Sequence, residues 1–506
     1  MSRARRAGIA AGFGYLQFAL ALVSGIALVP FILSRVGTAQ FGVWLAFGEL
    51  LAYSSMVDLG VVGVVPWLLA ESDGARDRAT MRSVLVGAVA FACAAAVVFA
   101  GLALLLLWLA PGVVGLTAEQ RAALTGPGLL LVAGMAVGMP LRAFYAAVIG
   151  LQDVAFAGKL ALAQLALAIA VTVVGLLAGL GLYALAAAAA VPALGAGVAS
   201  LLRLRRVAPD LLSGWRLPPW PLLRTMTAQG LGSWTGGLGW RMVAASDSMV
   251  VLAVAGPEAA VVYAMTLKLG AVAMQMGWQL PDAGLVGLAQ LKGEGRPERV
   301  REVTVSLLRL VMLGAGGVAC AMLAFNPSFV SLWVGPAHFG GLALNALLAG
   351  VVLAHSLGHG LFTTTATLGA RVHAGWASLA QGVVNLGAAV LLGRALGLPG
   401  VAAAAILSTA LVAYPAGVWM LRRTTGMSHR ELWAQVLGPW AWRAALLLAV
   451  GAVVGALAVR VSAWVPLALV PPLVVLYLWA MRPLYAGIPL PQRVRAVLSA
   501  LRLVPG

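Results

Sequence analysis

The chain has 506 residues, of which 62% are hydrophobic and only 9% are charged, and its mean hydropathy is +1.00. These values exclude a soluble globular domain and are typical of a polytopic membrane protein. The net charge of +18 would suit nucleic-acid binding, but the basic residues gather in short segments between apolar runs. We therefore interpret the charge as a topology signal and predict no nucleic-acid partner.

About fourteen apolar segments follow one another along the chain. Each is long enough to cross a hydrocarbon core of ~30 Å as a helix, and none shows the alternation of a membrane strand. They cover residues 8–33, 41–70, 83–109, 123–150, 158–179, 182–202, 225–254, 259–288, 302–325, 341–366, 374–396, 399–421, 440–459 and 464–481. The sequence therefore predicts an all-α polytopic membrane protein with about fourteen transmembrane helices.

Most of the 33 basic residues fall on one side of these segments. Residues 1–6, the segment 203–224 and the chain after 482 are all on that side, whereas the opposite loops hold Arg35, Arg121, Arg394 and Arg460. Because basic loops stay in the cytoplasm, we predict that both termini are cytoplasmic. For the basic tail 488–506 we leave open a short helix on anionic lipid headgroups or an unstructured segment.

An internal repeat organises the chain. The phrase GTAQFGVW at 37–44 returns as GPEAAVVY at 256–263, and later landmarks keep nearly the same offset of about 219 residues. This pattern predicts two six-helix lobes of parallel design, 1–205 and 225–425, joined by a cytoplasmic basic linker at 206–224. Two further helices within 440–482 lie outside the repeat.

Ionisable residues inside membrane helices are functional candidates because their insertion is costly, at roughly 2.5–3.5 kcal/mol each. The candidates are Glu49, Asp58, Arg142, Arg241, Asp247, Lys268, Asp282 and Arg309. Glu49 and Lys268 lie 219 residues apart and therefore occupy equivalent repeat positions. They form either a substrate or proton site, or a salt bridge that closes a gate.

Arg241 is the strongest candidate for an anion ligand, because the planar guanidinium suits phosphate and stays charged. Asp247 follows six residues later, roughly 240° around the helix, and is a poor partner for it on the same helix. Two further pairs, Asp58 with Arg142 and Asp282 with Arg309, are interpreted as internal ion pairs, although Asp58 is also a candidate for coupling.

His355 and His359 are spaced as metal ligands on a helix, but no third ligand accompanies them, and Cys93 and Cys320 lie in apolar segments. We predict no metal site and no cofactor. No phosphate-binding glycine loop or nucleophile motif is present, and no loop is long enough for a catalytic domain.

Several short phrases in this order and spacing are similar to those of a known family. They are PFILSRVG at 30–37, FGVW at 41–44, Tyr53 with DLG at 58–60, DSMVVL at 247–252, VYAMTLK at 262–268 and SLWVG at 331–335. Over about residues 8–425 the chain resembles the Wzx-like oligosaccharide flippases of the multidrug/oligosaccharidyl-lipid/polysaccharide exporter superfamily. The two C-terminal helices resemble the extra pair of the fourteen-helix lipid II flippase.

The resemblance implies two lobes in a MATE-like V shape that work by alternating access in the bacterial inner membrane. It implies an undecaprenyl-pyrophosphate-linked oligosaccharide as substrate, with membrane lipids and polysaccharide polymerase machinery as partners. Arg241 and Lys268 would bind the anionic headgroup, Glu49, Asp58 and Asp247 would serve gating or coupling, and residues 440–481 would form a lipid groove. The coupling to protons, sodium or membrane potential stays open.

Two alternatives remain. A multidrug or small-metabolite cation antiporter of the same superfamily would use cavity acids such as Asp58, Asp247 and Glu49, but would not need Arg241 and Lys268. A polysaccharide polymerase or ligase would need a long outer loop with catalytic side chains, whereas the longest outer loops contain only Arg121 and His338 as candidates. We therefore expect a transporter and not an enzyme.

Overall fold

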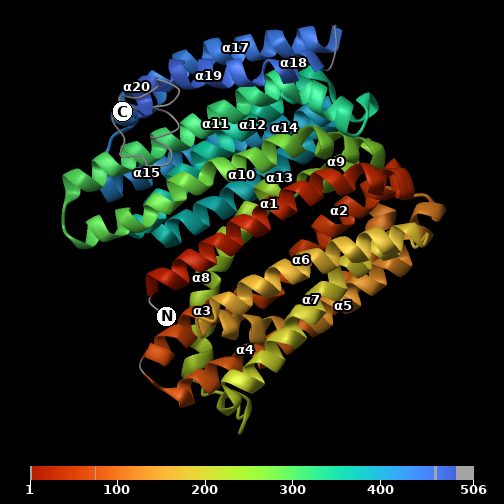
Figure 1. Ribbon diagram of the computed structural model, residues 1–506, viewed down its shortest axis with the longest axis vertical. Helices are drawn as coiled ribbons and strands as arrows, with labels where there is room; N and C mark the ends of the chain where they lie inside the picture. Colours follow the sequence, from red (N-terminus) through yellow and green to blue (C-terminus); the bar gives the residue numbers. More distant parts are fainter. Residues whose placement is uncertain (1–2, 75, 461–463, 486–506) are drawn as a thin grey trace. The chain divides into compact units, whose positions relative to one another are not determined.

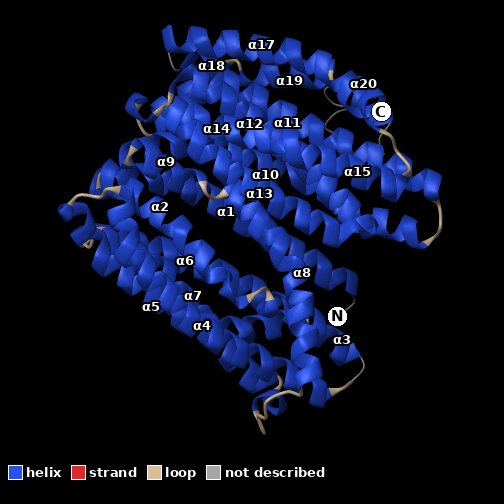
Figure 2. Cartoon of the chain, turned by 180° about the vertical axis from the view of Figure 1, so that it is seen from behind, coloured by secondary structure: helices blue, strands red, loops and turns tan. Residues whose placement is uncertain are grey.

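The computed structural model describes residues 3–74, 76–460 and 464–485, and every regular element in these ranges is a helix (Figure 2). The predicted basic tail, 488–506, lies outside the described residues. The chain divides into two compact units, Met1–Leu238 and Gly239–Gly506, which are described separately below.

The N-terminal unit holds seven long helices and two short 3-10 turns in the described ranges, together with most of α8. The elements are α1 (Arg3–Val36), α2 (Thr38–Ser54), η1 (Ser55–Asp58), α3 (Val61–Gly74), α4 (Arg78–Val114), α5 (Ala118–Gly150), α6 (Val154–Leu177), α7 (Leu182–Val207), η2 (Pro209–Leu212) and α8 (Trp220–Ala244). The division between the units falls inside α8.

The C-terminal unit continues from the end of α8 through twelve further helices and several π or 3-10 turns. They are α9 (Asp247–Ala255), α10 (Pro257–Gly293), α11 (Pro297–Trp333), η3 (Pro336–His338), α12 (Gly341–Thr365), η4 (Ala366–Ala370), α13 (Arg371–Leu396), α14 (Leu398–Ser408), η5 (Thr409–Ala413), α15 (Tyr414–Thr425), α16 (His429–Leu432), η6 (Trp433–Leu437), α17 (Gly438–Arg460), α18 (Trp464–Ala468), α19 (Val470–Ala480) and α20 (Arg482–Tyr485).

The lengths of these helices confirm a multi-pass membrane protein. In the described ranges, 11 helices are long and apolar enough to cross a membrane, or up to 12 when the pair 38–58 and 61–70, bent by 49°, is one span. The span Gly341–Leu396 contains Gly369 at φ +106°, which separates α12 from α13, and Val470–Ala480 is a shorter apolar helix. Each of the fourteen predicted segments therefore coincides with a helix or a broken helix.

The local backbone repeats in the two halves of the chain. Gly37 before α2 and Gly256 before α10 have φ +86° and +90°, and Gly181 before α7 and Gly397 before α14 have φ +51° and +68°. Positive φ is a conformation that glycine adopts at little steric cost. The predicted repeat thus places glycines where both halves need the same turn between helices.

Small residues allow α5 and α7 to pack closely in the N-terminal unit. A Cβ atom on Gly134 would lie 2.3 Å from the Cβ atom of Ala190, and one on Gly197 would lie 2.4 Å from that of Leu141. Such stripes bring helix backbones together in the membrane, where dispersion contacts replace the hydrophobic effect. The adjoining core is formed by apolar side chains of α3, α4, α5 and α7.

The predicted linker at 206–224 packs against the N-terminal unit. After α7 it forms η2, where Leu211 is fully buried, and Nε of Arg82 in α4 donates to the carbonyl oxygen of Asp210 at 3.0 Å. The structural division at 238–239 therefore lies beyond this segment. The lobe boundaries derived from the repeat stay a prediction.

The C-terminal unit is organised around α11, which packs against α10, α12 and α17 (Figure 1). A buried cluster joins α11, α12 and α15 to the added C-terminal helices, and includes Leu308, Leu361, Trp440 and Tyr477. The hydroxyl of Tyr477 in α19 donates to the carbonyl oxygen of Leu313 in α11 at 2.5 Å. The two helices beyond the predicted repeat are thus an integral part of this unit.

Candidate functional site

Asp58 closes the sharp turn between α2 and α3. It is 8% exposed, and its Oδ1 accepts a hydrogen bond from the backbone N–H of Gly60 at 3.1 Å, while Leu59 and Gly60 have φ +47° and +72°. No ion pair joins Asp58 to the exposed Arg142 of α5 among the described residues. The predicted Asp58–Arg142 pair is absent because the carboxylate is used within its own turn.

Asp247 is the first residue of α9, directly after the break that follows α8. It is 6% exposed, and its Oδ2 accepts a hydrogen bond from the hydroxyl of Tyr263 in α10 at 2.8 Å. Its Oδ1 is buried without a hydrogen-bond partner in the described part of the chain. A half-satisfied carboxyl group at a helix break is suited to hold a proton or a cation.

The other predicted ligands lie in both units. Glu49 is half-buried in α2 of the N-terminal unit, whereas Arg241 near the end of α8 and Lys268 in α10 are half-buried in the C-terminal unit. Lys268 makes no ion pair with any described residue. The proposed pairing of Glu49 with Lys268 across the repeat stays a prediction.

Asp282 and Arg309 do not pair, which corrects the sequence-based interpretation. Nε of Arg309 in α11 donates to the carbonyl oxygen of Gln435 in η6 at 2.8 Å. A Cβ atom on Gly284 in α10 would lie 2.6 Å from Leu307, so Leu307 faces α10. Arg309, two residues on and roughly 200° around the helix, therefore points away from α10.

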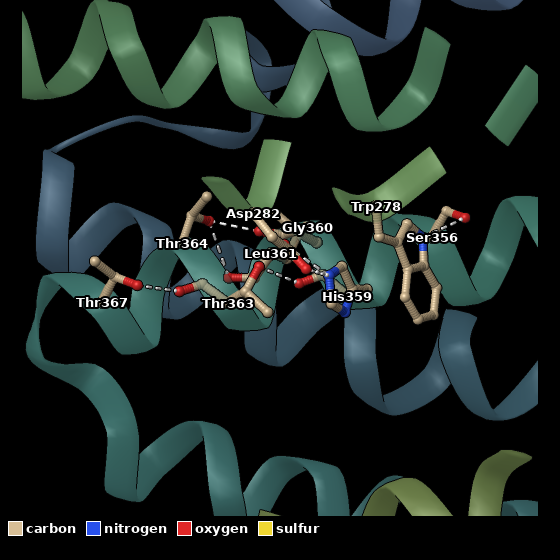
Figure 3. A network of polar contacts seen from close by, with 9 residues as sticks. All are labelled: Trp278, Asp282, Ser356, His359, Gly360, Leu361, Thr363, Thr364 and Thr367. Atoms are coloured by element: carbon tan, nitrogen blue, oxygen red, sulfur yellow. Dashed lines mark hydrogen bonds and ion pairs between the residues drawn. The ribbon is translucent and has the colours of Figure 1, made fainter. Parts of the chain in front are cut away.

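Asp282 pairs with His359 of α12 instead (Figure 3). Nε2 of His359 lies 3.0 Å and 3.1 Å from the two carboxylate oxygens. The imidazole ring also stacks on the indole ring of Trp278, with centroids 4.0 Å apart and planes inclined by only 5°. Trp278 and Asp282, four residues apart on one face of α10, thus hold the same imidazole.

Further aromatic contacts extend this group. Nε1 of Trp278 donates to Oγ of Ser356 at 3.0 Å, and Trp240 at the end of α8 meets both Trp278 and His355 edge to face. His355 is buried, and its Nε2 has no hydrogen-bond partner among the described residues. We call Trp240, Trp278, Asp282, His355, Ser356 and His359 the histidine–aspartate cluster.

An apolar cavity of about 480 Å³ lies among α10, α11, α17 and α19. Its lining includes Met276, Pro281, Leu313, Ala321, Leu447 and Tyr477. The Tyr477 hydroxyl is already bonded to a backbone carbonyl, so the walls offer almost no polar group to a ligand. The cavity is suited to a hydrocarbon chain, because its walls are almost entirely apolar.

Comparison with known proteins identifies the architecture. No protein-family model and no curated protein sequence matches the chain. A solved structure described as the inward-facing conformation of a multidrug resistance MATE family transporter of the MOP superfamily is similar to it, with a TM-score of 0.64 and 16% identity over 81% of this chain and 95% of that one. The chain has the MATE fold.

Two further structures agree with the MATE fold. The outward-facing conformation of a multidrug resistance MATE family transporter has a TM-score of 0.54 and 16% identity, over 83% of this chain and 93% of that one. MATE in complex with MaD3S has a TM-score of 0.58 and 15% identity, over 81% of this chain and 94% of that one. This chain is therefore longer than the MATE chains that it matches.

Within this MATE fold, sequence reasoning missed the joint role of Trp278, Asp282 and His359. A signal was present, since Trp278 and Asp282, like His355 and His359, are spaced by four residues in otherwise apolar segments. Each pair marks one polar stripe on a helix, but the sequence does not say that the stripes face each other. No three His, Cys, Asp or Glu side chains gather to hold a metal in the described ranges.

Proposed function

We propose that the protein is a flippase that moves a lipid-linked oligosaccharide across the bacterial inner membrane by alternating access. Likeness to a transporter fold seen in inward-facing and outward-facing conformations supports the transport class. Undecaprenyl-pyrophosphate-linked sugar is the substrate class that we propose, because it combines a long hydrocarbon chain with an anionic, polar head.

The main support for this proposal is the apolar cavity beside α17 and α19, the C-terminal helices that lie outside the predicted repeat. A drug-sized cation needs polar or charged partners in its site, whereas this cavity offers walls of aliphatic and aromatic side chains from α10, α11, α17 and α19. In the membrane a prenyl chain gains dispersion contacts with such walls, because the bilayer and the cavity are both apolar. A prenyl chain would therefore be held without any directional contact.

The proposed headgroup ligands are Arg241 and Lys268. Both belong to the C-terminal unit, which also forms the cavity. A guanidinium binds a phosphate in a two-pronged arrangement, and an ammonium adds a second positive charge. We propose that they receive the pyrophosphate while the lipid chain stays in the apolar cavity, and that Glu49, Asp58 and Asp247 serve gating or coupling.

A multidrug or metabolite cation antiporter is the second candidate. One observation favours it: Oδ1 of Asp247 is buried without a hydrogen-bond partner in the described residues, and such a carboxylate attracts cations. The solved structures that the chain resembles are also described as multidrug resistance transporters. The two candidates differ in whether Arg241 or Asp247 is needed for binding.

Proteoliposomes test the two candidates directly. Flipping of a fluorescent undecaprenyl-pyrophosphate sugar is measured for the wild type, Arg241→Ala and the control Arg443→Ala, whose guanidinium donates to the Pro439 carbonyl oxygen of its own helical turn. We expect flipping by the wild type and the control, and a loss of at least about 10-fold in Arg241→Ala, since a charge-assisted hydrogen bond contributes ~1.5–3 kcal/mol.

Two results would contradict this assignment. Equal flipping by Arg241→Ala and the wild type would remove Arg241 from the site. Absence of flipping, combined with movement of a cationic dye that Asp247→Asn abolishes, would establish the antiporter instead. The amount of monodisperse protein is measured for each variant, because a residue that is needed only for folding lowers that amount.

A further inference from the structure

The histidine–aspartate cluster has the geometry of a proton-binding site. Nε2 of His359 faces both carboxylate oxygens of Asp282, so with an ionised carboxylate this nitrogen carries the hydrogen and donates it. Nδ1 of His359 makes no hydrogen bond with any described residue. A proton added at Nδ1 converts the hydrogen-bonded pair into an imidazolium–carboxylate ion pair without moving a heavy atom.

Two neighbours stabilise the positive charge that such a proton brings. The carboxylate of Asp282 supplies a full opposite charge, and the indole ring of Trp278 lies parallel to the imidazole at 4.0 Å. A cation on the face of a tryptophan ring gains roughly 0.5–2 kcal/mol. The hydrogen bond from Trp278 to Ser356, one turn before His359 on α12, keeps the indole in this position (Figure 3).

In the described part of the chain, no other charged side chain bonds to Asp282 or His359. Helix α12 also carries His355, which contacts Trp240. The helices that contact α10 and α12 carry these other ionisable groups: Arg241 on α8, beside Trp240; Asp247 on α9; Glu258, Tyr263, Lys268 and Lys292 on α10; Glu298, Arg299, Arg301, Glu302, Arg309 and Cys320 on α11; His338 on η3; Arg371, His373 and Arg394 on α13; Tyr414, Arg422 and Arg423 on α15; and Arg443 on α17.

Arg309 is the cation on α11 at the level of the pair. A Cβ atom on Gly360 would lie 3.2 Å from Leu308 and 3.3 Å from Val311, which brings this stretch of α11 against α12. The guanidinium nevertheless donates to Gln435. Lys292 similarly donates to the carbonyl oxygen of Leu368 at 2.7 Å. Neither of these cations therefore forms an ion pair with Asp282.

The proton state of the pair has a consequence for α12. With His359 protonated the pair is neutral overall, whereas loss of the proton leaves one net negative charge on the side chain of Asp282, which is 40% exposed, and a net charge is less favourable in a membrane protein. Directly after His359, the hydroxyls of Thr363 and Thr364 in α12 bond to backbone carbonyls of α12, and so does the hydroxyl of Thr367 in the π turn η4, which follows α12. Such features mark helices that bend.

We infer that Asp282 and His359 bind the proton whose gradient drives transport, and that its release favours a different arrangement of α10 and α12. This inference rests on the proposed transport function. Histidine suits the role because its unperturbed pKa of about 6.5 allows it to change charge near neutral pH. The coupling proton is thereby assigned to the C-terminal unit, at a residue pair distinct from Asp58 and Asp247.

A substrate-free measurement tests the site itself. The chain has 5 histidines, so ¹⁵N-histidine NMR of the purified protein gives few signals, and His359→Gln identifies that of His359. Glutamine retains an N–H donor toward Asp282 but cannot take up a proton. We expect the His359 signal to change when the imidazole takes up the proton. A signal that does not respond to pH would overturn the inference.

Transport measurements test whether this site couples the proton gradient to transport. The fluorescent undecaprenyl-pyrophosphate sugar is followed in proteoliposomes with and without an imposed pH gradient, for the wild type, His359→Gln, Asp282→Asn and the control His373→Gln, an exposed histidine on α13. We expect the gradient to accelerate the wild type and the control, and to leave both cluster variants at the wild-type rate without a gradient. Asp282→Asn keeps the test informative if His359→Gln does not fold.

The two proposals fail in different ways. Continued acceleration by the gradient in both cluster variants would overturn the proton site and leave the flippase intact. A wild type that moves no lipid-linked sugar would overturn the flippase, and the NMR titration would then decide the proton site alone.

Discussion

Single residues in this protein show how buried charge is managed in a membrane. Asp58 bonds to the backbone of its own turn, Asp282 to His359, and Arg309 to the carbonyl oxygen of Gln435. Each of these partners satisfies part of the charge, and an unsatisfied ion in a membrane helix is costly. A charged residue in such a helix is therefore not by itself evidence of a substrate site.

Two substitutions of Asp58 distinguish a structural role of this residue from a role in coupling. Asp58→Ala removes the acceptor for the Gly60 N–H, and we expect it to lower the stability by about 1 kcal/mol, as for other side-chain caps. Asp58→Asn retains an acceptor oxygen and should keep the wild-type thermal midpoint in detergent. Asp73→Ala, which removes an exposed pair with Arg78 at 3.7 Å, is the control and should change little.

The Asp58 variants also test whether the charge of Asp58 is needed for gradient-driven transport. If Asp58→Asn has wild-type stability but loses gradient-driven transport, the charge of Asp58 acts in coupling. Equal thermal midpoints for Asp58→Ala and the wild type would show that the turn does not depend on this hydrogen bond.

At the scale of elements, glycine allows α8 to approach the turn between α2 and α3 within the N-terminal unit. A Cβ atom on Gly230 would lie 2.7 Å from the carbonyl oxygen of Leu59. Four residues later on α8, Nε1 of Trp234 donates to the carbonyl oxygen of Met56 at 2.7 Å. The close approach and the hydrogen bond together connect α8 to the turn that holds Asp58.

We expect Gly230→Ala to lower the thermal midpoint, because the added methyl group must displace backbone atoms, and overpacking typically costs ~1–3 kcal/mol. Gly237→Ala is a matched control on the same helix, since its Cβ atom would lie at an ordinary 3.7 Å from Met56. Differential scanning fluorimetry of both purified variants measures the difference. A larger loss in Gly237→Ala than in Gly230→Ala would contradict this packing.

At the scale of the whole molecule, the C-terminal helices α17 and α19, which lie outside the predicted repeat, belong to the C-terminal unit. They pack on α11 and complete the apolar cavity. If that cavity holds a prenyl chain, its volume determines which lipid is accepted. This property belongs to the assembled C-terminal unit and to no single helix.

Ala321→Phe tests the cavity by filling it. We expect this variant to reduce flipping of the undecaprenyl-linked sugar by at least about 10-fold, and to affect an analogue with a short prenyl chain much less, because the phenyl ring removes the dispersion contacts of the long chain with the cavity walls, at ~0.1–0.2 kcal/mol for each pair of atoms. Ala452→Phe, at an exposed position of α17, is the control. Equal rates for Ala321→Phe and the wild type with the long-chain substrate would place the lipid elsewhere.

The positions of the helices could be predicted from the sequence alone, and so could the turn glycines Gly37 and Gly256. Hydropathy is a property of consecutive residues, and a left-handed turn depends on one residue, so both signals are local. The same local signals identified Asp282, Arg309 and His359 as unusual. They did not identify Asp282 and His359 as partners.

The tertiary structure decided which of these residues meet. Asp282 and His359 are 77 residues apart, and their contact depends on the rotation of α10 and α12 about their own axes. A change of two positions in α11 turns a side chain by roughly 200°, which separates Leu307, facing α10, from Arg309, facing η6. Rotation and neighbour choice arise from packing among distant segments, so the ion pair and the apolar cavity became visible only in the folded chain.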